Sequence, residues 1–343
     1  MRSWPGLLVS LVLLVIVFTV VDLEALASSL ALADYRYFLP ALLVFLVGLG
    51  MRTFAWRTLL LEKARLGQTF FALNEGYLLN NLLPFRLGEF GRAFLLSRSA
   101  GLGFLQVLSS IVVERIFDLS LVVGVLLITL PFVVGAEDWA RPAALSMGAA
   151  LLLAFILLHL LARNQVRARS WFERLQARFS PLKRVRVDQV DTLFQGLAAL
   201  VDLRRFLLVL VSLGLTWLLV IYHYYLVLLA FVPEARFLWA AFGIGVVGLG
   251  VAVPSAPGSV GVVQGVIVAV FPSLFGLDPA VALAYGLTVH AFYLLATSGL
   301  GLVGLARERA SLSGVYSEIR ARIRPSREGD RPELEEKPQY EDL

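Results

Sequence analysis

Cysteine is absent from the 343 residues, and charged side chains are scarce. The lack of cysteine excludes disulfides, thiolate nucleophiles and thiolate metal ligands. Asp, Glu, Lys and Arg make up only 16% of the chain, against about a quarter in an ordinary soluble domain. Hydrophobic residues make up 59%, which is more than a soluble globule of this size could bury. These shortages indicate an integral membrane protein.

Nucleotide and metal signatures are missing as well. The chain has no G-x-x-x-x-G-K-[ST] loop to hold the phosphates of ATP, and it has no Asp-x-Asp pair. Its three histidines each stand alone in an apolar segment, where a helix-to-helix hydrogen bond is the commoner role: His159, His223 and His290. We therefore expect no cofactor, no bound metal and no enzymatic activity.

The net charge of +5 raises the question of nucleic acid. The arginines, however, are divided among loops between apolar segments and do not form one soluble basic face. We therefore expect no nucleic-acid partner. Orientation in a membrane explains these arginines better.

Six segments are long and apolar enough to cross a bilayer, whose hydrocarbon core of about 30 Å needs about 20 helical residues. The sequence therefore predicts an all-α, polytopic membrane helix bundle. Its membrane domain covers residues 1–306, and a charged cytoplasmic tail, predicted to be disordered, covers 307–343. The expected spans are 5–21, 38–61, 105–134, 142–162, 206–231 and 279–306. The last turns of the second span carry Arg52 and Arg57, whose long side chains can reach the membrane interface.

Basic residues set the expected orientation, because short loops rich in Lys and Arg stay in the cytoplasm. Ten of them fall within 163–205, which becomes a basic cytoplasmic loop inside the membrane domain. Seven acids and three arginines occur in the loops that we assign to the outside, near 22–36, 136–141, 232–236 and 272–279. This arrangement predicts a multi-pass protein of the cell (inner) membrane with both termini in the cytoplasm.

Two segments are too interrupted to cross the bilayer as plain helices. Residues 66–103 contain polar and charged side chains around Pro84, while 237–277 has no charge and is broken by Pro254, Pro257 and several glycines, with Asp278 just beyond. The charge count places both ends of the first segment inside and both ends of the second outside. We therefore predict two re-entrant hairpins of opposite direction, a layout that recurs in transporters.

The first candidate site gathers charged side chains on and after the first hairpin. A backbone broken near Pro84 would free amides that, with Arg86 and Arg92, can hold a lipid phosphate. Intramembrane charges are expensive, so they mark function or obligatory pairing. Four acids and four arginines lie between residues 75 and 118, so an internal clasp of ion pairs is the competing interpretation. The candidate substrate-binding residues are Asn81, Arg86, Glu89, Arg92, Glu114, Arg115 and Asp118.

The second candidate site is the break in the second hairpin. Proline and glycine leave free carbonyls and amides there, which can coordinate an ion or a headgroup hydroxyl. The competing interpretation is a packing kink, with Gly261 and Gly265 as a small-residue helix contact. The candidate residues are Pro254, Ser255, Pro257, Gly258, Gly261 and Gln264.

In this order, the motifs resemble the lysylphosphatidylglycerol synthase transmembrane-region family, also called flippase-like integral membrane proteins, over about residues 5–306. The resemblance implies a domain similar to the one that moves aminoacylated phosphatidylglycerol between leaflets in full-length synthases. Only 37 residues follow Ala306, so synthase activity is expected to be absent. Gln264 stands where an acid is expected in many relatives, which weighs against proton or cation coupling there. The matching residues are Pro84, Arg86, Gly88, Glu89 and Arg92, then Glu114, Arg115 and Asp118, then Pro254, Pro257, Gly258 and Gly261.

The leading hypothesis is a flippase or carrier for an anionic lipid or lipid-linked headgroup, driven by a gradient or by simple facilitation and not by ATP. Arg86 and Arg92 would bind the headgroup phosphate, and Glu114, Arg115 and Asp118 would tune and gate the site. The alternatives are an intramembrane enzyme acting on a polyprenyl-phosphate or phospholipid, and a scaffold for an envelope enzyme. The expected partners are membrane lipids with anionic headgroups. A homodimer is also considered, although no sequence feature supports it.

Overall fold

The computed structural model describes residues 4–83, 87–133, 137–164, 198–252 and 256–308, together with three single positions. All regular secondary structure in these ranges is helical, so the predicted all-α polytopic bundle is confirmed. The helices are α1 (Trp4–Val20), α2 (Leu23–Ala31), α3 (Phe38–Leu59), α4 (Leu66–Leu82), α5 (Gly88–Ala100), α6 (Phe104–Val133), α7 (Glu137–Arg163), α10 (Leu203–Leu229), α11 (Phe237–Ala252), α12 (Val262–Phe275) and α13 (Pro279–Glu308). Short 3-10 turns are η1 (Tyr35–Tyr37), η4 (Ala198–Leu200) and η5 (Pro257–Ser259).

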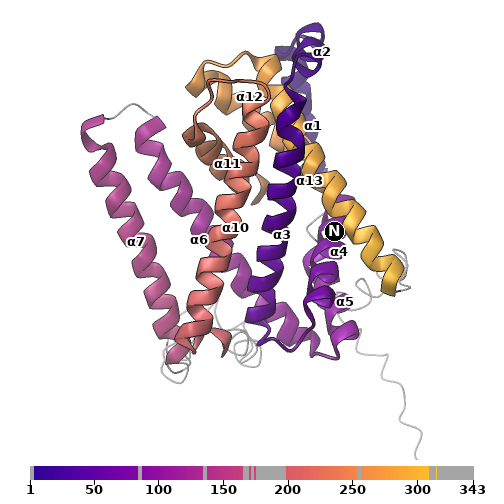
Figure 1. The fold of residues 1–343 in the computed structure, drawn as a ribbon, viewed down its shortest axis with the longest axis vertical. Coiled ribbons are helices and arrows are strands. Elements are labelled where there is room, and N and C mark those ends of the chain that lie inside the picture. The colour runs from indigo at the N-terminus through magenta and orange to yellow at the C-terminus, as the bar shows by residue number, and fades with distance from the viewer. Residues whose placement is uncertain are drawn as a thin grey trace, which may run out of the picture.

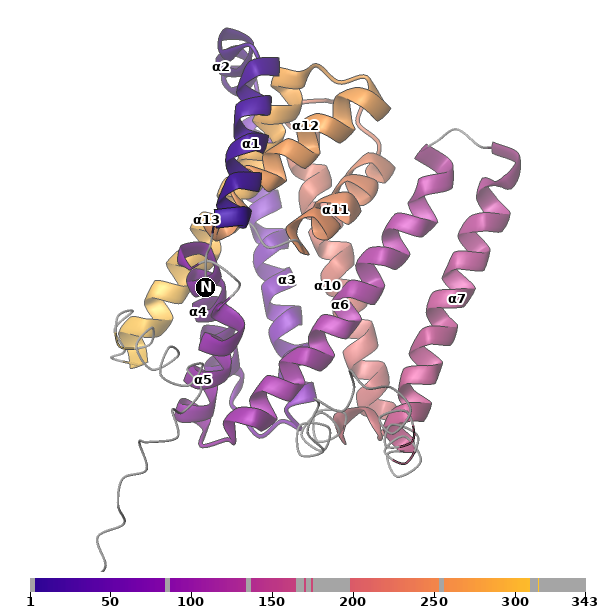
Figure 2. The same ribbon diagram turned by 180° about the vertical axis from the view of Figure 1, so that it is seen from behind.

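Five helical stretches in the described ranges are long and apolar enough to cross a membrane: Tyr35–Leu59, Phe104–Val133, Leu203–Leu229, Pro257–Phe275 and Pro279–Glu308. The expected span at 142–162 is the 27-residue α7, whose apolar stretch is the shorter Leu145–Leu160. The expected first span is the 17-residue α1, about 25 Å long at the usual helical rise. It begins at mid-height and rises beside α12 to α2 at one end of the bundle (Figure 2).

The two interrupted segments form helical hairpins at opposite ends of the bundle. Helices α4 and α5 pack together in the lower half of Figure 1, while α11 and α12 pack together in the upper half. Their outer limits, 66–100 and 237–275, agree with the predicted hairpins. Turn η5 at the tip of the second hairpin packs on α4, so the two tips meet inside the bundle. Entry of each hairpin from its own membrane face stays a prediction.

Long helices surround the hairpins. Helix α3 packs along α10, and α13 packs along α4. Trp56 and Phe117 lie in a buried cluster of α3, α6 and α10, and Phe271 and Tyr285 lie in a second one shared by α10 to α13. Large apolar side chains also cover the outer surface, as expected where lipid replaces water.

Acidic side chains shape the loops outside the spans. Asp202 begins α10 and accepts a hydrogen bond from the Arg205 amide, which lowers the pKa of Asp202. Asp34 precedes η1 and pairs with the exposed Arg36 at 2.7 Å, and the hydrogen bond from that guanidinium lowers the pKa of Asp34. Most of the basic loop 163–205 and the tail 307–343 lie outside the described residues, so these domain assignments stay predictions.

Candidate functional site

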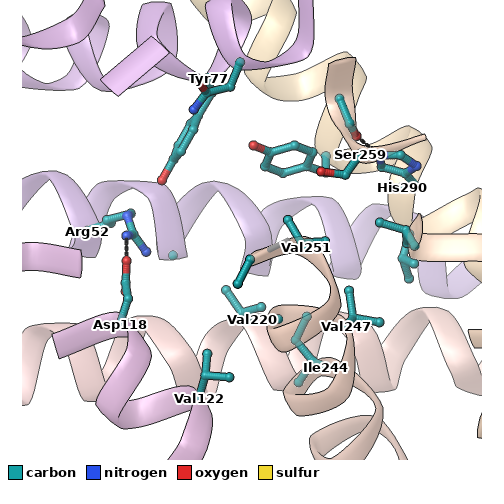
Figure 3. A pocket seen from close by; sticks show the side chains of 18 of the residues that line it. Arg52, Tyr77, Asp118, Val122, Val220, Ile244, Val247, Val251, Ser259 and His290 are labelled. Carbon is teal, nitrogen blue, oxygen red and sulfur yellow. Dashed lines mark hydrogen bonds and ion pairs between the residues drawn. The ribbon is translucent and has the colours of Figure 1, made fainter. Parts of the chain in front are cut away.

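A cavity of about 610 Å³ lies between the two hairpin tips. Figure 3 shows Arg52 and Asp118 at one end and Ser259 and His290 at the other. The wall between these ends is apolar and comes from α6, α10 and α11, through Val122, Val220, Ile244, Val247 and Val251. The cavity therefore joins a charged end to a neutral polar end along a hydrocarbon surface.

The charged end is built by six side chains from three helices, which we call the charge cluster: Arg52 of α3, Glu89 and Arg92 of α5, and Glu114, Arg115 and Asp118 of α6. Three cations face three anions, so the cluster is formally neutral. A balanced set of this kind lowers the large penalty for charge in an apolar interior. The cluster thus combines the two interpretations of the sequence: it is an ion-pair clasp, and part of it lines a cavity.

Glu114 is the centre of the charge cluster. Its carboxylate is fully buried and lies 2.7 Å from Arg52, 3.0 Å from Arg92 and 3.4 Å from Arg115. It does not line the cavity. Glu114 therefore holds the three guanidinium groups together on the side of the cluster that faces away from the cavity.

Arg52 is the cluster member that the sequence did not assign to the site. Its position near the end of a span suggested a guanidinium at the membrane interface. In the structure Arg52 is only 9% exposed and forms a short ion pair with Asp118, which also accepts a hydrogen bond from Trp217 Nε1 at 3.1 Å. The sequence signal that could have identified Arg52 is its depth in the span. Arg52 precedes the end of α3 at Leu59 by seven residues, or about 10 Å, which places it inside the apolar segment.

Arg92, a predicted phosphate ligand, lies outside the cavity wall. Its guanidinium is 2.8 Å from Glu89 and 3.0 Å from Glu114, and it stacks 4.7 Å above the Trp56 ring. Gly76 of α4 gives it room, since a Cβ there would lie 2.8 Å from Arg92 Cβ. In this conformation Arg92 is buried between Glu89 and Glu114, and its role as a phosphate ligand stays a prediction.

Arg115 is the most accessible cation of the charge cluster. Its side chain is 34% exposed and lines the cavity, whereas Arg52 keeps only 11% of its side chain exposed. Its ion-pair contacts are long: 3.3 Å to Asp118, 3.4 Å to Glu114 and 3.8 Å to Glu89. Arg115 is therefore the group that an incoming anion can reach with the least rearrangement.

Asn81 joins the first hairpin to α13. Its amide nitrogen donates to Thr297 Oγ1 at 3.1 Å and to Ser298 Oγ at 3.0 Å. Asn81 also lines the cavity, and its backbone is close to Gly258, where an added Cβ would lie 3.5 Å from the Asn81 carbonyl oxygen. This contact is where the two hairpin tips meet.

The second hairpin is fixed by a chain of neutral hydrogen bonds. The Gly261 amide donates to Gln264 Oε1 at 2.9 Å, Gln264 Nε2 lies 2.9 Å from His290 Nδ1, and His290 Nε2 lies 2.8 Å from the Gly258 carbonyl. Because an amide nitrogen only donates and a carbonyl only accepts, His290 accepts at Nδ1 and carries its proton on Nε2. Gln264 and Gly261 therefore lock the tip, while Gly258 and His290 face the cavity.

Some predicted site residues cannot be compared with the geometry. Arg86, Pro254 and Ser255 lie outside the described residues. Pro257 begins η5 but does not line the cavity. Over the described residues, no three His, Asp or Glu side chains are grouped as metal ligands.

Comparison with known proteins gives one match. A family model described as the Lysylphosphatidylglycerol synthase TM region matches residues 3–301. No curated protein and no solved structure matches the chain. The match covers both hairpins, the charge cluster and the cavity between them. The chain therefore belongs to the lysylphosphatidylglycerol synthase transmembrane-region family, a family of lipid-related membrane proteins.

Proposed function

We propose that the protein is a flippase or carrier that moves a lipid with an anionic headgroup between leaflets without ATP. The observation that carries this proposal is the cavity, which presents the accessible Arg115 at one end and an apolar wall beside it. An amphiphile needs both surfaces at once. Family membership supports a lipid-related role but does not specify transport.

Arg115 is the proposed headgroup ligand. Its guanidinium can bind a phosphate with two parallel hydrogen bonds, which are stronger than its present contacts of 3.3–3.8 Å. A phosphate can replace Glu89 as a partner of Arg115, because Glu89 stays paired with Arg92 at 2.8 Å. After the exchange each acid of the charge cluster still contacts Arg52 or Arg92, and the bound phosphate adds one negative charge to the cluster.

The apolar wall is the proposed contact for the start of the acyl or polyprenyl chains. Each methylene that leaves water for this wall contributes about 0.8 kcal/mol. The headgroup and its chains would thus lie between hairpin tips that come from opposite ends of the bundle. Movement of one tip and then the other would open the cavity to each side in turn, as in transporters with broken helices.

The proposed setting is the cell (inner) membrane, with both termini and the 163–205 loop in the cytoplasm. The proposed partners are anionic membrane lipids, and the protein acts as a single chain or as a homodimer. Catalysis is not part of the proposal, because a transport role uses the charge cluster without a nucleophile.

Lipid scrambling in proteoliposomes tests the proposal. Wild type should move fluorescent anionic phospholipid or polyprenyl-phosphate probes, and Arg115→Gln should slow this movement about 10-fold to 100-fold through loss of a charged hydrogen bond. Arg36→Gln is the matched control, since Arg36 pairs only with Asp34 in an outer loop and should transport normally.

Each other outcome favours a named alternative. A chemically altered probe, detected by chromatography after incubation, would show an intramembrane enzyme. Folded wild type that neither moves nor alters any probe would favour the scaffold. Unchanged transport by folded Arg115→Gln would remove Arg115 from the headgroup site.

A further inference from the structure

Glu75 of α4 is a buried acid that the proposed transport site does not use. Its side chain is fully buried, and neither carboxylate oxygen has a hydrogen-bond partner within the described chain. Among the described residues Glu75 also forms no ion pair, whereas every acid of the charge cluster forms at least one. A charged carboxylate buried in this way would be costly unless it were neutralised.

The surroundings of Glu75 are a close helix contact. Helices α4 and α13 run antiparallel, and Glu75 lies against Gly304, where an added Cβ would be 2.5 Å from Glu75 Oε1. One turn to either side, Phe71 stacks with Arg307 at 4.8 Å and a Cβ on Gly301 would lie 2.7 Å from Leu78 Cβ. The carboxyl group is therefore enclosed by the two helix backbones.

No cation balances Glu75 from the elements packed on α4. Glu308 is also an acid and stands one turn beyond Gly304 on α13. Its negative charge repels a charged Glu75. Glu308 is partly exposed and is the last residue of α13. The charged residues on these elements are Glu308 and Arg307 on α13, Glu89, Arg92 and Arg98 on α5, and Arg52 and Arg57 on α3.

A proton fits this site better than a metal ion. Calcium or magnesium needs about six oxygen ligands, and sodium likewise needs several, but Glu75 is packed directly against Gly304. A proton needs no coordination shell, and it removes both the burial penalty and the repulsion from Glu308. Glu308 offers a second carboxyl through which the proton can reach the aqueous phase.

We propose that Glu75 is a proton-binding site whose occupancy couples the proton gradient to movement of the first hairpin. The proton converts the carboxylate to a carboxylic acid, which lets α4 lie against α13. Loss of the proton leaves a charge between the helices and favours their separation. This inference rests on the proposed lipid transport, for which it supplies the driving ion.

The link to transport is the same helix pair. Asn81, further along α4, holds Thr297 and Ser298 of α13 and lines the cavity. Separation of α4 from α13 at Glu75 would therefore strain the hydrogen bonds of Asn81 to α13, and with them the position of Asn81 against Gly258 of the second tip. Proton binding in the middle of α4 would thus control the cavity at its C-terminal end.

Two measurements test the proposal. Infrared difference spectroscopy of wild type minus Glu75→Gln should show the C=O stretch of a protonated carboxylic acid at neutral pH. In proteoliposomes, coupling of one proton to each lipid predicts that a gradient of one pH unit shifts the leaflet distribution of the probe about tenfold. Glu75→Gln keeps the neutral form that holds α4 against α13, so it should ignore the gradient and move lipid more slowly than wild type. The matched control, Glu234→Gln in an outer loop, should behave as wild type.

The outcomes separate this proposal from the transport proposal. Lipid movement that ignores the gradient in wild type would overturn proton coupling and leave the carrier intact. If wild type moves no lipid, the carrier fails, and the infrared band alone decides whether Glu75 binds a proton. Because the amide mimics the neutral acid, failure of Glu75→Gln to fold would argue for a charged Glu75 and would overturn the proposal.

Discussion

The two hairpins have similar shapes but are held in place by different chemistry. The α4–α5 hairpin places Glu89 and Arg92 in the charge cluster with residues of α3 and α6. The α11–α12 hairpin contains no charged residue, and its tip is held by Gln264 and His290. Its chain direction changes at Gly258 and Gly261, which have φ values of +65° and +87°.

This difference separates a part that can exchange partners from a part that cannot. Ion pairs of 3.3–3.8 Å around Arg115 can be replaced by those of an anionic lipid. The second hairpin instead has a chain of three hydrogen bonds, from the Gly261 amide to Gln264, from Gln264 to His290, and from His290 to the Gly258 carbonyl. Each donor in this chain has one acceptor. We infer that the first hairpin bears exchangeable ion pairs beside Arg115 of α6, while the tip of the second hairpin moves as one rigid unit.

Removal of Glu114 is expected to have the largest effect. Glu114→Gln leaves the three arginines of the charge cluster with two acids, and breaking a buried ion pair in this way costs roughly 3–5 kcal/mol. The midpoint of thermal unfolding in detergent should therefore fall steeply, or folded protein should be lost. The measurement is intrinsic fluorescence during heating, together with the yield of monodisperse protein.

A second variant shows whether charge balance is the cause. Arg92→Gln combined with Glu114→Gln restores equal numbers of cations and anions, so it should recover part of the lost stability. A double variant no more stable than Glu114→Gln alone would mean that the shape of Glu114, and not its charge, holds the first hairpin.

The uncharged hairpin should instead be sensitive to backbone shape. Gly261→Ala introduces a Cβ at positive φ and 2.6 Å from the Ser10 carbonyl oxygen of α1. Gly276→Ala is a control for positive φ without packing, because Gly276 has φ of +68° and no atom within 4 Å of its Cβ position, although its ψ is +21° and that of Gly261 is −41°. The control should lose about 1–2 kcal/mol from left-handed strain, and Gly261→Ala about 1–3 kcal/mol more from overpacking.

Chemical denaturation of both glycine variants measures this difference. Equal losses would contradict the close packing of α1 on the second hairpin tip. A larger loss for Gly261→Ala is expected from its backbone angles, φ +87° and ψ −41°, together with the close approach of Ser10 in α1.

The hairpins could be predicted from the sequence because their signals are local. Polar residues around Pro84 and the glycines around Pro257 interrupt apolar segments, while the direction in which each hairpin enters the membrane stays a prediction from loop charges. The structure gives hairpin limits that agree with these breaks. Glu114 and Asp118 were likewise visible, since an acid inside an apolar helix is itself a signal.

The partners of these residues could not be predicted, because they are distant in sequence. Arg52 pairs with Asp118 across 66 positions, and Gln264 contacts His290 across 26. Arg52 was assigned to the interface since a long side chain near a helix end can reach water. Only tertiary packing shows that Arg115 faces the cavity while Arg92 lies behind it.

Removal of the Gln264 amide is expected to have the smallest of these effects. Gln264→Met keeps the length of the side chain but leaves the Gly261 amide and His290 Nδ1 without partners, a loss of roughly 1–3 kcal/mol. His290→Phe removes the other partner and should destabilise by a similar amount. The measurement is the free energy of unfolding of both single variants and the double variant.

The double variant decides whether the hydrogen-bond chain is one unit. If Gln264 and His290 act together, the double variant loses less stability than the sum of the single losses, by about 0.5–3 kcal/mol. Losses that simply add would mean that the two side chains act separately. The second hairpin would then be held by close backbone packing at its glycines. The first hairpin, by contrast, is held by ion pairs between side chains.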